Sequence, residues 1–100
     1  MSKIQETIDV MKAGNIQVIE ECVNSEKAIL IVNAIIFGTQ QKINSPNFVS
    51  GLEKATQNQT VLMGHQVNEF AVAALDILGK QKYTGTKQSI KDMIKFKMNL

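Results

Sequence analysis

Apolar residues recur along this chain at helical spacing, in short stretches separated by glycines and polar turns. Ile4, Ile8 and Met11 lie three or four positions apart, and the same spacing relates Val67 to Ala71. Residues three or four apart share one face of an α-helix, so each stretch can bury one side against its neighbours. The pattern therefore predicts an all-α protein.

Local signals mark where these helices begin and end. Asn15 and Ser45 can each cap a helix, because their side chains accept a hydrogen bond from a free amide of the first turn. Pro46 suits the first helical position, where no amide hydrogen is needed. Glycines that can end a helix in the left-handed conformation are Gly14, Gly38 and Gly79. We expect about six short helices, over about residues 3–13, 15–24, 26–37, 46–55, 61–78 and 86–98.

The stretch from Ala28 to Phe37 is almost continuously apolar. Such a run is compatible with a buried strand, but its length, a capping serine at position 25 and the glycine at position 38 favour a helix that is buried on nearly all sides. A bilayer-spanning helix needs about 20 apolar residues, and this run is much shorter. We therefore expect a soluble protein.

Part of the sequence repeats itself at an interval of 41 positions. When Ala34–Leu52 is moved forward by this interval it falls on Leu75–Met93, and Gly38 falls on Gly79. Each copy has an apolar stretch, a glycine, a polar loop, a hydroxyl residue and a second apolar stretch. Internal repeats of about 40–47 residues are typical of two-helix solenoid units.

The chain from about residue 25 to residue 98 resembles a HEAT/armadillo-type α-helical repeat. The stretch from Val67 to Gly79 is similar to the first helix of such a repeat, and the stripe of Ile90, Met93 and Ile94 resembles the second. This resemblance implies two HEAT-like helical hairpins, preceded by an N-terminal helical cap. A compact helical bundle is the alternative.

Charge is distributed unevenly between the two halves. Residues 1–53 contain four lysines and six acidic residues, which gives −2, whereas residues 54–100 contain seven lysines and three acidic residues, which gives +4. All the basic residues are lysine. Arginine supplies the planar fork that usually reads guanine bases, so its absence argues against sequence-specific nucleic-acid binding. The composition is typical of an AT-rich bacterial or phage genome.

Residues able to carry out chemistry are few and scattered. Cys22 is the only cysteine and His65 the only histidine, so they form no cluster for structural zinc, and no disulfide can form within the chain. Cys22 also lies beside an apolar helical stripe, which favours a buried thiol over a nucleophile. We therefore expect no enzyme activity and no cofactor, and a reducing, cytoplasmic location.

Lysines gather near the C-terminal end of the chain. Three of them recur every fourth residue on one side of the last helix, two lie in the loop before it, and a phenylalanine off the apolar stripe is a candidate exposed anchor. A basic amphipathic helix can bind an acidic protein, nucleic acid or an anionic membrane, or can simply be solvated. The candidate partner-binding residues are Lys80, Lys82, Lys87, Lys91, Lys95 and Phe96.

Two functions follow from these patterns. The first is a small non-enzymatic protein-binding module of the inhibitor, immunity or adaptor type, whose partner has an acidic surface. The alternative is a lysine-rich helical protein that binds nucleic acid or acts as a regulator.

Overall fold

The computed structural model describes residues 3–62, 64–80 and 88–96. These residues form six helices and one short hairpin, which confirms the predicted all-α class. None of the described helices is long and apolar enough to cross a membrane. The elements are α1 (Lys3–Lys12), α2 (Ile16–Val23), α3 (Ala28–Gln40), α4 (Pro46–Ala55), β1 (Val61–Leu62), β2 (His65–Gln66), α5 (Val67–Ile77) and α6 (Gln88–Phe96).

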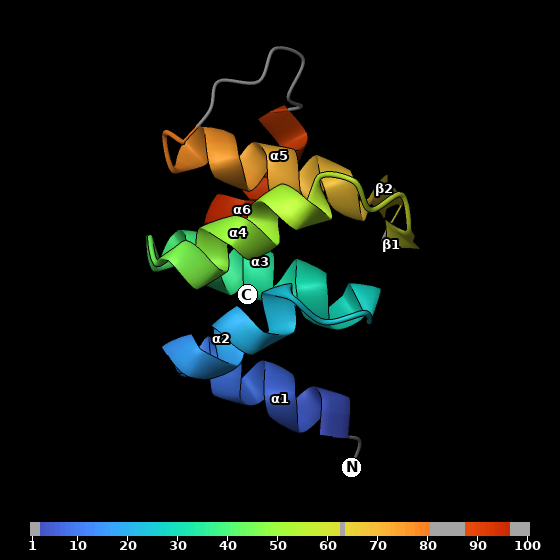
Figure 1. Cartoon of the computed structure of the whole chain (residues 1–100). Helices are drawn as coiled ribbons and strands as arrows, with labels where there is room; N and C mark the ends of the chain where they lie inside the picture. The colour runs from blue at the N-terminus through green and yellow to red at the C-terminus, as the bar shows by residue number, and fades with distance from the viewer. Residues whose placement is uncertain (1–2, 63, 81–87, 97–100) are drawn as a thin grey trace.

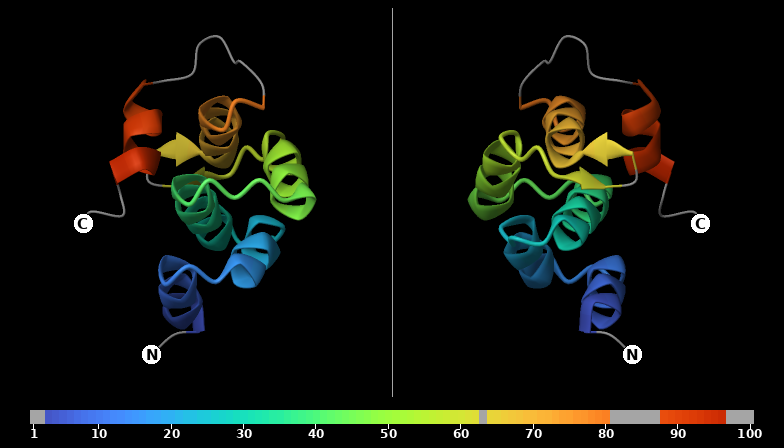
Figure 2. Two further views of the ribbon diagram at one scale, coloured as in Figure 1. Left: turned by 90° about the vertical axis from the view of Figure 1, so that its left-hand side faces the viewer. Right: turned by 90° about the vertical axis from the view of Figure 1, so that its right-hand side faces the viewer.

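Helices α1 to α4 are stacked in chain order from the N-terminus (Figure 1). Seen end-on, α1 to α4 step alternately between two sides of the molecule, and α5 and α6 lie beyond them (Figure 2). Helix α3 is at the centre, where it contacts every other helix and most extensively α1, α2, α5 and α6. The core therefore forms around α3.

Helix α3 is the segment for which the sequence allowed either a strand or a helix. Residues 31–39 are all buried, including the polar Asn33 and Thr39. Asn33 satisfies its side chain within the helix, since its Nδ2 donates to the carbonyl oxygen of Ile29 at 2.8 Å. The continuous apolar run is thus explained by a helix covered on all sides rather than by a strand.

The predicted caps at Asn15 and Ser45 are confirmed. The Asn15 side chain accepts from the Val18 amide at 3.1 Å, and the Ser45 hydroxyl accepts from the Phe48 amide at 3.3 Å. The Ser45 hydroxyl also donates to the Glu20 carboxylate, which ties the start of α4 to α2. Gly14 and Gly79 adopt the left-handed conformation just after α1 and α5, as expected of helix stops.

The prediction that Gly38 ends the third helix was wrong. Helix α3 continues through it to Gln40, and the left-handed turn is made by Lys42 at a φ of 56°. Gly38 is required for packing instead: a Cβ atom there would lie 2.4 Å from the Phe48 ring. The glycine allows α4 to approach α3 closely.

Two helix starts also differ from the prediction. The fifth helix was expected from Val61, but β1 and β2 form an antiparallel hairpin there, and α5 begins at Val67. Gly64 makes the hairpin turn at a φ of 79°. The third helix begins at Ala28 rather than at Glu26, because the Ser25 hydroxyl accepts from the Lys27 amide and delays the first turn.

Two further expectations concern the start of the last helix and the internal repeat. The expected start of the last helix, at about residue 86, lies outside the described residues. The two-fold HEAT-like repeat stays a prediction.

Replacing Gly38 with alanine tests the contact between α3 and α4. At an exposed helical site this change would stabilise the protein by about 1 kcal/mol. Here we expect urea denaturation to show a loss of about 1–3 kcal/mol, because the new methyl group overlaps the Phe48 ring. Adding Phe48→Leu should make the combined loss smaller than the sum of the two single losses. Stabilisation by Gly38→Ala would contradict the close approach.

Candidate functional site

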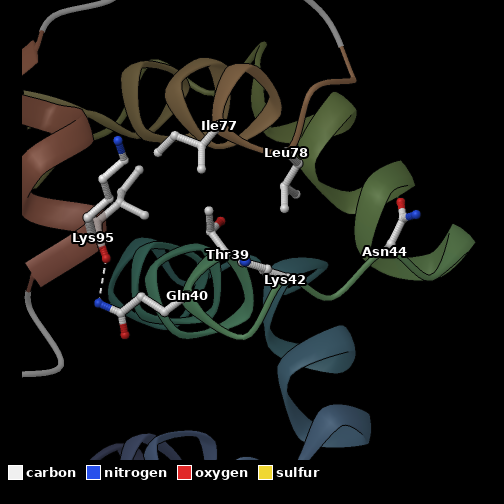
Figure 3. Close-up of a pocket in the computed structure, with 8 residues that line it drawn as sticks. Thr39, Gln40, Lys42, Asn44, Ile77, Leu78 and Lys95 are labelled. Carbon is white, nitrogen blue, oxygen red and sulfur yellow. Dashed lines mark hydrogen bonds between the residues drawn. The ribbon is translucent and has the colours of Figure 1, made fainter.

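A pocket of about 530 Å³ opens where α3 and α5 end beside α6. The close-up in Figure 3 shows α3 below this pocket, α5 above it, and α6 and the start of α4 at opposite ends. Its size lies within the range of about 300–1,000 Å³ that is usual for ligand sites. The described lining residues are Thr39, Gln40, Lys42, Asn44, Ile77, Leu78, Ile94 and Lys95.

The lining combines an apolar wall with positive charge. Ile77 and Leu78 contribute from the end of α5, and Ile94 from α6. Lys42 and Lys95 supply the charge, and both are exposed. No carboxylate occurs among the described lining residues. The arrangement therefore suits a group that is partly apolar and negatively charged.

Thr39 and Gln40 bring polar atoms without partners to this region. Thr39 is only 3% exposed, and its side chain points from α3 toward Ile77 and Leu78 (Figure 3). Its Oγ1 and the Oε1 of Gln40 are buried and have no hydrogen-bond partner among the residues that the structure describes. The Gln40 Nε2 donates to the Ile94 carbonyl oxygen and so links α3 to α6. An unpaired buried polar group costs about 1–3 kcal/mol of stability, so the Thr39 hydroxyl would gain from a hydrogen bond to a bound molecule.

The predicted partner-binding lysines have different environments. Lys95 lines the pocket, and Lys80 is exposed directly after the α5 stop. Lys91 instead forms an ion pair with Asp76 of α5, with 2.7 Å between its Nζ and the Asp76 Oδ2. The two side chains are only 24% and 18% exposed. Lys91 therefore holds α6 against α5 and is not a free positive charge.

The remaining predicted residues are less informative. Lys82 and Lys87 lie outside the described residues, and so does the side chain of Phe96, which ends α6. Lys42 and Thr39 line the pocket but were not among the site residues predicted from the sequence. No local pattern marks them, because the pocket is created by the packing of α3 on α6, more than fifty positions further along the chain.

Cys22 and His65 do not form a catalytic pair among the described contacts. Cys22 is buried in α2, and burial, together with the nearby Glu21 carboxylate, raises the pKa of its thiol, which disfavours the reactive thiolate. His65 packs edge-on against Phe70, and its Nδ1 lies 3.8 Å from the Glu69 carboxylate. The described residues contain no group of side chains suited to hold a metal ion.

Comparisons of this chain with protein-family models, with curated proteins and with solved structures found no match. The chemistry of the pocket and its surroundings is therefore the basis for assigning a function.

The ion pair between Lys91 and Asp76 should be detectable as a coupling in a double-mutant cycle. Because both side chains are largely buried, we expect Lys91→Ala and Asp76→Ala to be coupled by about 1 kcal/mol in urea denaturation. Lys95→Ala, one turn further along α6, should change stability little and show no coupling to Asp76→Ala. Equal coupling of both lysines to Asp76 would contradict the distinction between them.

Replacing Thr39 with valine tests whether its hydroxyl is unpaired. Valine has nearly the same shape but needs no hydrogen bond, so stability should stay unchanged or rise by about 1 kcal/mol. Thr7→Val is the matched control, because the Thr7 hydroxyl donates to the Lys3 carbonyl oxygen at 2.8 Å. Destabilisation by Thr39→Val beyond that of the control would show that the hydroxyl has a partner within the protein.

Proposed function

We propose that this protein is a small non-enzymatic helical module that binds the acidic surface of a protein partner. Its docking face consists of α6, the pocket and the end of α5. The observation that carries the proposal is the set of exposed lysines at this face: Lys42 and Lys95 line the pocket, and Lys80 follows two residues after Leu78.

The net field at this face supports an acidic partner. The C-terminal ends of α3 and α5 meet here, and each helix end carries about half a negative charge. Three lysines contribute a larger positive charge than these two helix ends together remove. Such a patch steers an acidic partner into contact and selects against a basic one.

The alternation of α1 to α4 between two sides of the molecule is consistent with a HEAT-type module (Figure 2). Stacked helical pairs of that kind present broad surfaces to other proteins. Inhibitors, immunity proteins and adaptors all act by occupying a partner's surface, which requires no catalytic group. We therefore place the chain in this functional class.

Nucleic acid is the less favoured partner. A phosphate backbone is usually bound by a continuous track of positive charge. Here Lys91 is neutralised by Asp76, and the lysines that remain exposed flank an apolar pocket. An apolar wall between positive charges suits a protein surface better than a phosphate backbone.

The proposal is tested by charge reversal. The protein, immobilised by a tag, is exposed to nuclease-treated lysate of its source cell, and the retained protein is identified, purified and titrated. We expect Lys80→Glu combined with Lys95→Glu to weaken binding by at least tenfold, because two attractive charges become repulsive. The matched control is Lys3→Glu combined with Lys27→Glu, which reverses two exposed lysines at helix starts far along the chain from the pocket.

The control pair should bind like the unaltered protein. Thermal melting of both double variants establishes that they are folded. Equal affinity of the two double variants for the partner would overturn the proposed face. In a separate titration of the purified protein with DNA and RNA, tight binding that weakens steeply with salt, together with no protein retained from the lysate, would overturn the proposed class of partner.

A further inference from the structure

We infer that the pocket between α3, α5 and α6 is the anchor site for a short acidic segment of the partner. The segment inserts one aliphatic side chain against Ile77 and Leu78 and places a carboxylate beside Lys95. This inference rests on the proposed function and specifies the chemistry that the partner must bring.

The size of the pocket agrees with a segment of this kind. Its volume of about 530 Å³ exceeds the needs of one side chain, so it can hold a side chain together with the backbone on either side of it. Lys42 and Lys95 line the pocket and are exposed, so the pocket can be reached from solvent. A chain can therefore pass across it.

The apolar wall selects the inserted side chain. Ile77 and Leu78 are only half-buried although both belong to the end of a helix that packs into the core. Covering them with an aliphatic group removes apolar surface from water, which is the general driving force for anchoring at protein interfaces. A charged or small polar side chain would give no such gain.

The polar atoms favour a peptide over a simple anion. Thr39 points into the space below Ile77 and Leu78 (Figure 3), and its hydroxyl has no hydrogen-bond partner in the described part of the chain. After a turn about its Cα–Cβ bond, this hydroxyl can donate to a peptide carbonyl or accept from a peptide amide. A phosphate has no amide donor and no aliphatic group, so it would leave the apolar wall uncovered.

The charges determine the flanking residues of the segment. Lys95 stands at one end of the pocket and points toward α5 (Figure 3). Lys42 adds a second positive charge, and none of the described lining residues is acidic. A segment with a carboxylate on either side of its aliphatic residue satisfies both lysines, whereas a basic segment is repelled.

The inference is tested with short peptides that are acetylated and amidated at their ends. The probe has the sequence Asp-Leu-Asp, and its controls are Asp-Ser-Asp, Lys-Leu-Lys and inorganic phosphate. Binding is followed by NMR of the 15N-labelled full-length chain. We expect saturable shifts from Asp-Leu-Asp at the amides of Thr39, Gln40, Ile94 and Lys95. The controls should bind roughly tenfold more weakly or not at all, which corresponds to the loss of one charge-assisted or apolar contact.

Variants of the protein separate the contributions. Lys95→Gln and Thr39→Val should each weaken Asp-Leu-Asp binding several-fold, whereas Lys3→Gln, which changes a distant exposed lysine, should leave it unchanged. Equal binding of Asp-Leu-Asp and Asp-Ser-Asp, equal binding of phosphate at the same amides, or no saturable shift at the pocket would each overturn the anchor. If one of these results is obtained while the Lys80→Glu, Lys95→Glu variant still loses its partner, the anchor is overturned and the proposed function stands.

Discussion

The burial of α3 on every side is the constraint on which the rest of this structure depends. A helix that is apolar all round cannot lie at a surface, so other elements must cover each of its faces. Helices α1 and α2 cover it on one side, and α5 and α6 on another. The fit is close where side chains are small: Gly38 admits the Phe48 ring, and Gly51 of α4 lies where a Cβ would be 2.5 Å from Val23. These close contacts between helices allow the core to pack densely.

The pocket forms where this cover ends. Thr39 is the last buried residue of α3, Gln40 is partly exposed, and the chain turns away at Lys42. Because α5 also ends in this region, neither helix supplies another turn to close the space between them and α6. The same constraint that organises the core thus leaves a partly apolar hollow with lysines beside it, and this hollow is the basis of the proposed function.

Local chemistry could be predicted from the sequence, whereas features created by distant segments could not. The caps at Asn15 and Ser45 were predictable because a capping side chain acts within its own first turn. The role of Gly38 was not, because the same residue serves as a stop or as a close contact, and the choice depends on Phe48 ten positions later. Helical spacing placed Lys91 and Lys95 in one stripe. Only tertiary packing shows that Asp76 neutralises the first and that the second lines a pocket.

Native-state hydrogen exchange tests the central position of α3 most directly. If every other helix must leave before α3 is exposed, the amides of Val32–Phe37 exchange only through global unfolding. Their free energy of exchange should then equal the free energy of unfolding from urea denaturation, with lower values in α1. Exchange of the α3 amides at a free energy below that of the α1 amides would contradict the account.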